Sequence, residues 1–589
     1  MKSFLSRVSM MFGILLLTVV TLSQGLYAAS FEPDYGTENN ISTANGGMVV
    51  SAHPLASEAG LDVLNNGGNA VDAAIAMQYA LTVTEPMMSG IGGGGFMMVY
   101  DANTEETTII NSRERAPAGA EPDMFLKDDG EAMEFEDRVI HGNSVGVPGT
   151  PAGLQTSHDL WGTIAMPELI APAISLAEEG FPIDDFMAHQ IEENAEKLDR
   201  SASSEVFFNE GAPLAEGDML VQEDLANTLS MISENGTDYF YNGEIADALA
   251  DTVQEFEGSM TKEDMMNYDV TVDEPVWGQY KDYDIATMPP PSSGGIFLLQ
   301  MLGILDGFDL SQYDIQSVEK YHLYAETMHL AYADRAEYAG DPEFVDVPVE
   351  GLLHPDYLDE RRDLISLDSV IEEPEAGDVT PYQEGFEREG AVEQPGDKVD
   401  GQTTHYSVID QYGNVVSYTT TIEQVFGSGI MVPEYGFLLN NELTDFDAEP
   451  GGANEVQPNK RPLSSMTPTI VFNDGQPVLT VGSPGGQTII TSVLQTILNT
   501  YEYDLSLEDA LNEPRIFTNG PDSYSYEEGI SEDIISELND MGHGFTEEPA
   551  PIGNVNSIMY NTDDSTYTGA TDENRNGAAF GFEAEPVEQ

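Results

Sequence analysis

Residues 396–410, GDKVDGQTTHYSVID, join a charged loop to a run of residues with strand character. The sequence alternates from Thr403 to Ile409, residues 411–414 predict a turn, and VVSYTTTI at 415–422 alternates again. The stretch therefore predicts a hairpin of two central strands, and the first strand begins at a hydroxyl-bearing residue.

The segment before this hairpin, residues 372–402, has ten acidic and two basic residues together with repeated Pro and Gly. Such a composition predicts an exposed, mobile segment. Long loops of this kind inside compact proteins are usually functional or disordered. The segment ends abruptly at Gln402.

Two interpretations fit Thr403. Threonine is common in strands because β-branched side chains suit a pleated surface. Alternatively, the Gln402–Thr403 bond is cut, and the new α-amine of Thr403 activates its own hydroxyl as a nucleophile. A free α-amine has a pKa of about 7.7–8, which suits a general base at neutral pH.

A second motif lies in QPVLTVGSPGGQTIITSVLQ, residues 476–495. It predicts a strand to Gly482, a turn through Gly485 and Gly486, and a helix from about Gln487. Adjacent glycines at a helix start leave backbone N–H groups unobstructed, an arrangement that can hold an oxyanion. An ordinary tight turn is the alternative.

The composition excludes some functions. With 105 acidic and 20 basic residues, the formal charge is -85, so a nucleic-acid-binding surface is not expected. The 40% hydrophobic content argues against a disordered chain. Because molar salt shortens the screening length to about 3 Å, this acidity indicates a halophilic protein. The length of 589 residues suggests one large domain or two closely joined ones.

The N-terminus predicts a signal peptide over residues 1–29. Lys2 and Arg7 precede an apolar stretch from Met10 to Leu22, and small residues follow at Ala28 and beyond. The stretch is shorter than the ~20 residues that a membrane span needs. We therefore expect a secreted protein, periplasmic if the source has an outer membrane, without a stable membrane span after signal removal. The chain has no cysteine, which excludes disulfides and thiolate chemistry.

No cofactor or metal is predicted. The glycine run Gly92–Gly95 lacks the GK[ST] ending of a phosphate-binding loop, so close backbone packing explains it better. His322 and His329 lie two helical turns apart, a spacing more typical of chance on a helix face than of a metal pair. The nine histidines form no other cluster in the sequence.

The chain resembles bacterial γ-glutamyltransferases (γ-glutamyltranspeptidases), which are threonine N-terminal-nucleophile hydrolases. The resemblance rests on QTTHYSVID, TTTIEQVFGSGI, LLNNELTDF, NKRPLSSMTPTI and VGSPGG, in this order, with RERAPAGA upstream and NRNGAAFGF near the end. It implies an α+β fold, a four-layer αββα sandwich. It also implies self-cleavage into a large subunit, residues 30–402, and a small subunit, residues 403–589, which form a heterodimer.

The resemblance also implies roles for individual residues. Thr403 matches the nucleophile and Thr421 the threonine that hydrogen-bonds it, while Gly485 and Gly486 match the oxyanion-binding pair. The predicted substrate-binding residues match an arginine and serines for the donor's α-carboxylate and acids for its α-ammonium. They are Arg113, Ser464 and Ser465 for the carboxylate, and Glu423, Glu442 and Asp445 for the ammonium.

Two departures from the family pattern matter. Many relatives have amides at the positions of Glu423 and Glu442, so this ammonium pocket is expected to be more anionic. Residues 446–459 form a shorter segment than the lid of some relatives, which predicts an open site.

The expected activity is transfer of a γ-glutamyl group from glutathione, glutamine or γ-linked polyglutamate to water, amino acids or peptides, through an ester on Thr403. The alternatives are a cephalosporin- or glutaryl-acylase-like amidase of the same fold and a non-catalytic exported amino-acid-binding protein.

Overall fold

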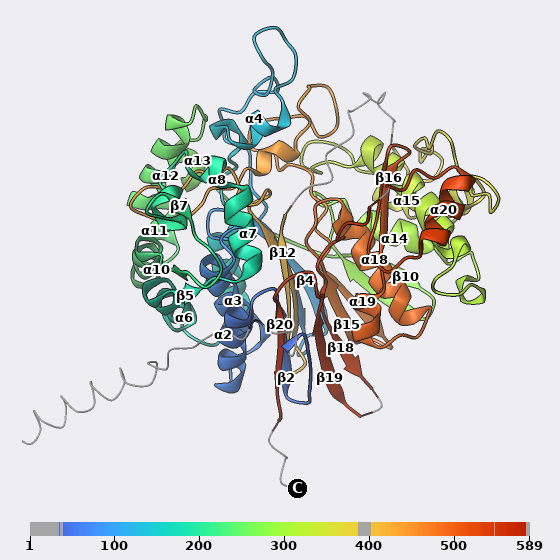
Figure 1. Ribbon diagram of the computed structural model, residues 1–589, viewed down its shortest axis with the longest axis horizontal. Helices are drawn as coiled ribbons and strands as arrows, with labels where there is room; N and C mark the ends of the chain where they lie inside the picture. Colours follow the sequence, from blue (N-terminus) through green and yellow to red (C-terminus); the bar gives the residue numbers. More distant parts are fainter. Residues whose placement is uncertain (1–34, 36–38, 387–401, 547, 563, 585–589) are drawn as a thin grey trace, which may run out of the picture. The chain divides into compact units, whose positions relative to one another are not determined.

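Two seven-stranded antiparallel sheets form the centre of the fold in the computed structural model (Figure 1). The structure describes residues 35, 39–386, 402–546, 548–562 and 564–584. The predicted signal peptide, residues 1–29, and residues 387–401 of the acidic segment lie outside the described residues. Both remain predictions.

The first sheet contains the predicted hairpin. Its order is β20 (Ala578–Phe582), β2 (Gly47–Ser51), β12 (Thr404–Ile409), β13 (Val415–Thr421), β3 (Gly94–Asp101), β4 (Glu106–Asn111) and β9 (Thr271–Asp273). Strands β12 and β13 pair in antiparallel register from Thr404 opposite Thr420 to Ile409 opposite Val415. The hairpin is therefore confirmed, with Thr403 immediately before its first strand.

The second sheet lies against the first. Its order is β1 (Ile41–Ala44), β19 (Thr566–Thr571), β18 (Asn556–Asn561), β15 (Gln476–Gly482), β14 (Thr469–Asn473), β11 (Tyr283–Thr287) and β10 (Val276–Tyr280). Strands before Gln402 and strands after Thr403 are interleaved in both sheets. In the first sheet, β2 lies between β20 and β12.

Alternating side chains build the space between the sheets. Met48 and Val50 of β2 share a buried cluster with Ile470 and Phe472 of β14, whereas Val49 points to the opposite face and packs with helices. Side chains with a period of two thus give each sheet two buried faces. This burial explains why the central strands are apolar or uncharged along most of their length.

Helices cover the two outer faces, so the predicted αββα sandwich is confirmed (Figure 1). The first sheet contacts α2 (Pro54–Asn65), α3 (Ala70–Thr84) and α5 (Thr150–Trp161), which are followed outward by α6 (Met166–Glu179) and α10 (Glu223–Asn235). The second sheet contacts α14 (Gly294–Leu305), α18 (Thr488–Tyr501) and α19 (Leu507–Asn512), and α15 (Val318–Tyr338) packs on α14.

Shorter helices complete the large middle region. They are α4 (Phe135–Val139), α7 (Asp185–Glu193), α8 (Ala195–Leu198), α9 (Ser203–Phe207), α11 (Asp238–Asn242), α12 (Glu244–Glu255), α13 (Lys262–Met266), α16 (Val349–Leu352) and α17 (Pro355–Arg362); α20 (Glu532–Met541) follows near the C-terminus. Within the described ranges, none of the helices is both long enough and apolar enough to cross a lipid bilayer.

Candidate active site

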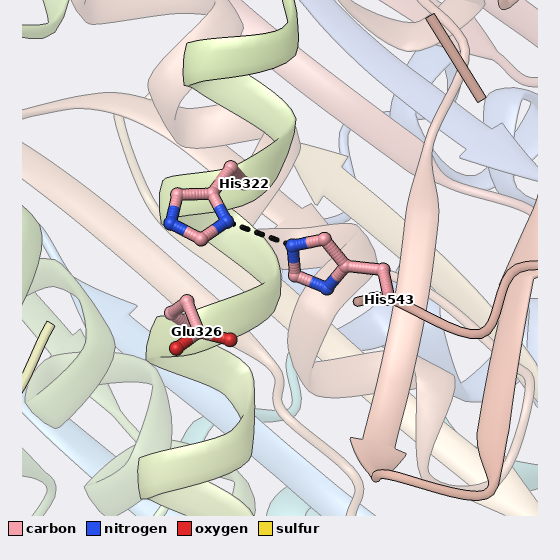
Figure 2. Close-up of side chains that lie close together, drawn as sticks. All are labelled: His322, Glu326 and His543. Atoms are coloured by element: carbon pink, nitrogen blue, oxygen red, sulfur yellow. Dashed lines mark hydrogen bonds between the residues drawn. The ribbon is translucent and has the colours of Figure 1, made fainter. Parts of the chain in front are cut away.

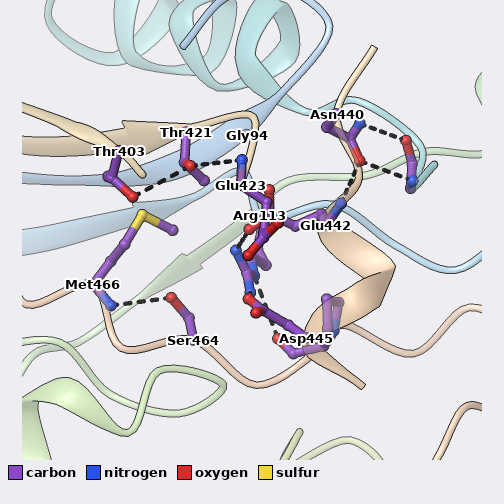
Figure 3. Close-up of polar contacts among 12 residues, drawn as sticks. Gly94, Arg113, Thr403, Thr421, Glu423, Asn440, Glu442, Asp445, Ser464 and Met466 are labelled. Atoms are coloured by element: carbon purple, nitrogen blue, oxygen red, sulfur yellow. Dashed lines mark hydrogen bonds and ion pairs between the residues drawn. The ribbon is translucent and has the colours of Figure 1, made fainter. Parts of the chain in front are cut away.

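Thr403 lies at the junction predicted from the sequence, with only 4% of its surface exposed. Its Oγ1 donates a hydrogen bond of 3.3 Å to Oγ1 of Thr421, the last residue of β13 (Figure 3). The hairpin register causes this contact, because the pair Thr404–Thr420 places the preceding and following residues opposite each other. The predicted pairing of Thr403 with Thr421 is therefore present in the structure.

The peptide bond between Gln402 and Thr403 is held by the same strand end. Thr421 Oγ1 donates to the carbonyl oxygen of Gln402 at 2.9 Å and accepts from the backbone N–H of Glu423 at 2.8 Å. The Gln402 N–H in turn donates to the Glu423 carbonyl at 2.7 Å. A hydroxyl that donates a hydrogen bond to a carbonyl polarises that carbonyl. The Thr421 hydroxyl therefore fixes the Gln402–Thr403 peptide bond and activates its carbonyl for attack.

Arg575 contacts both residues of the Gln402–Thr403 peptide bond, and the sequence did not predict this contact. Its guanidinium donates to the Thr403 carbonyl at 2.9 Å and to the side-chain oxygen of Gln402 at 3.1 Å. The partner of Arg575 is the buried Glu85, at 3.5 Å, which also accepts from Thr404 Oγ1 at 2.6 Å. The sequence did contain a signal for Arg575, since this residue belongs to the NRNGAAFGF motif.

Gly485 and Gly486 form the predicted turn between β15 and α18. Their φ angles are +128° and +56°, a region where a side chain would cause strain. Neither backbone N–H has a hydrogen-bond partner among the described residues. The turn therefore has two donors for an anion.

A cavity of about 250 Å³ opens in front of Thr403. It is lined by every predicted catalytic and substrate-binding residue except Gly485, namely Arg113, Thr403, Thr421, Glu423, Glu442, Asp445, Ser464, Ser465 and Gly486. Gly485 lines a second cavity of about 540 Å³, together with Gln402 and Arg575. The turn that carries the two glycines thus separates two spaces.

Arg113 is one of three arginines that line the cavity in front of Thr403, together with Arg138 and Arg335. It is 1% exposed and forms ion pairs with Glu442 and with Asp445, the latter at 2.6 Å (Figure 3). It also donates to the carbonyls of Leu463 at 2.8 Å and Pro462 at 3.3 Å. Four of its five N–H groups are therefore used, and one remains for a substrate carboxylate.

Burial and crowding of like charges change the ionisation of the acids around Arg113. Burial raises the pKa of Glu442 to about 7, although Arg113 lowers it. Burial also raises the pKa of Glu423 well above its usual value, and Asp445 and Glu442 raise it further. An ammonium ion in this pocket would relieve the repulsion and favour the ionised acids.

Ser464 and Ser465 lie beside the guanidinium on the segment that precedes β14. Ser464 Oγ accepts from the Met466 N–H at 3.1 Å, and Ser465 Oγ accepts from Arg335 at 3.2 Å. Because each oxygen is used as an acceptor, each hydroxyl can still donate its hydrogen to an anion. Arg335 also lines the cavity and was not predicted from the sequence.

Two further residues lie against Glu442, one of the acids around Arg113. Glu114 is fully buried beside Glu442, and neither of its carboxylate oxygens has a hydrogen-bond partner among the described residues. Burial, followed by the charge of Glu442, raises the pKa of Glu114 well above its usual value. Asn440 holds the start of the short 3₁₀ helix Glu442–Asp445 by accepting from the Glu442 N–H at 3.0 Å. Both belong to motifs noted in the sequence, but neither had been assigned a role.

Comparison with known proteins gives this geometry a family. A family model described as Gamma-glutamyltranspeptidase matches residues 56–582. The chain is 62% identical over 572 residues to the glutathione hydrolase proenzyme of Bacillus subtilis (strain 168), covering 97% of this chain and 97% of that protein. The chain belongs to the gamma-glutamyltranspeptidase family.

More distant relatives agree with this membership. The glutathione hydrolase proenzyme of Escherichia coli (strain K12) is 41% identical over 94% of this chain and 96% of that protein. The crystal structure of a cephalosporin acylase from Bacillus halodurans superposes with a TM-score of 0.83 at 28% identity, covering 95% of this chain and 100% of that one. The chain is thus an enzyme of the gamma-glutamyltranspeptidase family, and both glutathione hydrolase relatives are named as proenzymes.

Proposed function

We propose that this gamma-glutamyltranspeptidase family member cleaves γ-glutamyl amides and passes the γ-glutamyl group to water or to the amine of an amino acid or peptide. Glutathione, glutamine and γ-linked polyglutamate are the proposed donors. One observation carries the proposal: Thr403, paired with Thr421, shares a cavity with Arg113 and a set of buried acids. A γ-glutamyl group presents a carboxylate and an ammonium on one carbon, and this cavity offers partners for both.

Self-cleavage at Gln402–Thr403 is the first proposed step. Thr403 Oγ1 attacks the Gln402 carbonyl carbon, whose oxygen accepts the Thr421 hydroxyl. The acyl group moves from the Thr403 nitrogen to its oxygen, and water hydrolyses the resulting ester. Residues 30–402 then form the large subunit and residues 403–589 the small subunit of a heterodimer.

The new α-amine of Thr403 is the proposed general base for substrate cleavage. It takes the proton of Oγ1 as the hydroxyl attacks the γ-carbonyl, and it returns the proton to the leaving amine. The backbone N–H groups of Gly485 and Gly486 stabilise the oxyanion. Water or an acceptor amine then attacks the γ-glutamyl ester and frees Thr403.

A cephalosporin- or glutaryl-acylase-like amidase is the second candidate, because the superposed Bacillus halodurans structure is described as a cephalosporin acylase. The acids favour the first candidate. A glutaryl group has the carboxylate of a γ-glutamyl group but lacks its ammonium, so it would bring no second cation to the acids Glu423, Glu442 and Asp445, of which the last two share Arg113. A non-catalytic exported amino-acid binder, the third candidate, predicts one uncut chain.

Export through the predicted signal peptide, followed by secretion or retention in a periplasm, completes the proposal. The support is the layout of residues 1–29, in which two basic residues precede an apolar stretch and small residues.

Two measurements on the purified protein test the function. Denaturing electrophoresis with N-terminal sequencing should give two bands, one of which starts at Thr403. A matched pair of anilides, γ-glutamyl and glutaryl, should be hydrolysed with kcat/KM higher for the γ-glutamyl substrate by about 100-fold or more. A preference for the glutaryl anilide would instead identify the amidase, and an uncut, inactive chain would identify the binder.

A further inference from the structure

Three imidazoles and one carboxylate gather in a buried cluster that does not line either cavity. His322, Glu326 and His329 lie on α15, and His543 follows α20 (Figure 2). The sequence suggested only the helical pair His322 and His329. That interpretation missed His543, which is 221 residues from His322 and becomes its neighbour only through folding.

The inner atoms of the cluster face one another. His322 Nδ1 and His543 Nε2 are 2.8 Å apart. One ring nitrogen of each of these histidines and one carboxylate oxygen of Glu326 all lie within 4.8 Å of one another. His329 Nδ1 lies 3.4 Å from Glu326 Oε1. Three potential ligand atoms therefore converge from α15 and the segment after α20, and His329 adjoins the carboxylate.

The outer atoms on α15 are held by the surrounding scaffold. His322 Nε2 contacts the Ser366 carbonyl at 2.6 Å, so it carries the ring proton and leaves Nδ1 with a lone pair. Glu326 Oε2 accepts from the Ile371 N–H at 2.8 Å.

The outer nitrogens of the other two imidazoles also lie near scaffold hydroxyls. His329 Nε2 lies 3.0 Å from Thr518 Oγ1, and His543 Nδ1 lies 3.4 Å from the Tyr524 hydroxyl. Metal ligands in proteins are commonly oriented in this way, with the second ring nitrogen bonded to a scaffold atom. Because His322 Nδ1 has a lone pair, the 2.8 Å contact means that His543 Nε2 donates to it, and metal binding at this nitrogen would require the hydrogen to move to His543 Nδ1.

Charge and hydrogen bonding leave the inside of the cluster incomplete. Glu326 is 0% exposed, and neither its Oε1 nor Nδ1 of His329 has a hydrogen-bond partner among the described residues. Burying polar atoms without partners is costly. A divalent cation would neutralise the carboxylate and give the inner atoms a partner.

We propose that His322, Glu326 and His543 bind a divalent transition-metal ion, and that Zn²⁺ fits this set of two imidazoles and a carboxylate best. In a tetrahedral site with Zn–N bonds of about 2.0–2.1 Å, two ligand nitrogens stand about 3.3 Å apart. The imidazoles of His322 and His543 therefore need to separate by only about half an ångström on binding. His329 completes the set or orients Glu326.

The cluster lies beside the second cavity. Tyr524, which contacts His543, and Gly544, which follows it, line the cavity of about 540 Å³. This neighbouring space gives an ion a route to the cluster.

The position of the site suggests its purpose. His322 and Glu326 precede Gln402 in the chain, whereas His543 follows Thr403. The metal would connect the two products of the proposed cleavage, in a chain that has no cysteine for a disulfide. It would act as a structural tie and take no part in the reaction at Thr403.

The test measures metal retained by the full protein. Wild type is stripped with EDTA, loaded with Zn²⁺, passed through gel filtration in molar NaCl and analysed for zinc by mass spectrometry. About one Zn²⁺ per chain should remain in wild type, and the melting temperature should rise by a few degrees relative to the stripped protein. His322→Gln and His543→Gln should lose both effects, whereas the exposed control His189→Gln should keep them.

Two further measurements keep the proposal falsifiable if a histidine variant fails to fold. Glu326→Gln, which preserves side-chain size, should retain much less zinc. Co²⁺ loaded into wild type should give the visible absorption of a tetrahedral nitrogen- and oxygen-ligated site, which His189→Gln should share. Equal zinc in wild type and His543→Gln, or no retained zinc in wild type, would show that the cluster is only a hydrogen-bonded network.

Discussion

The Thr421 hydroxyl connects the nucleophile to the bond that the nucleophile is proposed to cut. It accepts from Thr403 Oγ1 at 3.3 Å and donates to the Gln402 carbonyl at 2.9 Å. One side chain at the end of β13 thus orients the attacking oxygen and polarises the attacked carbonyl. This relationship depends on the hairpin register, because a slip of one residue would turn Thr421 to the opposite face of the sheet.

Removal of the nucleophile should block both processing and activity. Thr403→Ala should remain a single chain and hydrolyse no γ-glutamyl anilide, since both reactions need the Thr403 oxygen. Thr403→Ser, which keeps a hydroxyl, should be cut and retain measurable activity. Denaturing electrophoresis and an anilide assay check both variants; two normal subunits from Thr403→Ala would remove Thr403 from its proposed role.

Arg113 should determine donor affinity. Arg113→Lys keeps one positive charge but cannot replace the four hydrogen bonds of the guanidinium, so the donor KM should rise by about tenfold or more. Arg115→Lys, a nearby ion-paired arginine that does not line the cavity, is the matched control. An unchanged KM in Arg113→Lys would be incompatible with the proposed carboxylate site.

The donor KM should depend on pH through Glu442. Its pKa of about 7 means that Glu442 carries a proton at pH 6 and is ionised at pH 8. The ionised form attracts the donor ammonium, so KM should fall as pH rises across this window. Glu442→Gln should flatten the profile, whereas Glu434→Gln, an exposed control, should not.

Ionisation of Glu442, which should strengthen donor binding as pH rises, should lower the stability of the fold over the same pH range. Because its folded pKa is raised above the unfolded value, the folded state binds the proton more tightly. The stabilisation is complete below the unfolded pKa of about 4.5 and is lost as pH rises through about 7. Melting temperatures of wild type and Glu442→Gln should therefore converge at low pH; a constant difference across the range would contradict the assignment.

Long donors should be accepted. The short segment 446–459 borders the cavity only through residues near its start, and Asp445 keeps 35% of its side chain exposed. A γ-linked glutamate oligomer can then place its first residue at Arg113 while the rest extends into solvent. Glutamate release from such an oligomer, but not from an α-linked oligomer, is expected. An enzyme active only on small donors would show that the cavity is closed.

Salt should stabilise the protein. Within the described residues, eight basic side chains are buried, which leaves few of the 20 to balance the acids at the surface: Arg113, Lys320, Arg335, Arg361, Lys460, Arg461, Arg515 and Arg575. Screening lengths fall from about 10 Å at 0.1 M to about 3 Å at 1 M salt. The melting temperature should therefore rise steeply with NaCl, while kcat changes much less. Equal melting temperatures in about 0.05 M and about 2 M NaCl would refute the halophilic interpretation.

The sequence predicted the parts of the site that depend on local register. The turn at 411–414 fixes which residue of β13 lies opposite each residue of β12, so the contact between Thr403 and Thr421 follows from the hairpin alone. The turn at Gly485 and Gly486 was also predictable, because it depends only on residues that are adjacent in the sequence. That Gly485 and Gly486 line different cavities was not, because this depends on what packs on each side of the turn.

Contacts between distant segments could not be predicted from residue spacing. Arg575 reaches Gln402 because the chain returns to place β20 beside β2, and His543 reaches His322 because the segment after α20 folds onto α15. The ion pairs of Arg113 likewise could not be predicted from residue spacing. The sequence suggested a guanidinium available for substrate, whereas the structure shows it already paired with two acids.

Because the strands are interleaved, the proposed cut should also report whether a molecule has folded. The hairpin alone brings Thr403 to Thr421, but Arg575 reaches the Gln402–Thr403 bond only when β20 lies beside β2, which requires segments from both ends of the chain. We therefore expect a chain that never assembled this sheet to remain uncut. The proposed cut would then be a permanent mark on each molecule that once reached the native fold, and it would persist if the molecule later unfolded. In an aged preparation, the ratio of cut to uncut chains would distinguish protein that folded and then failed from protein that never folded.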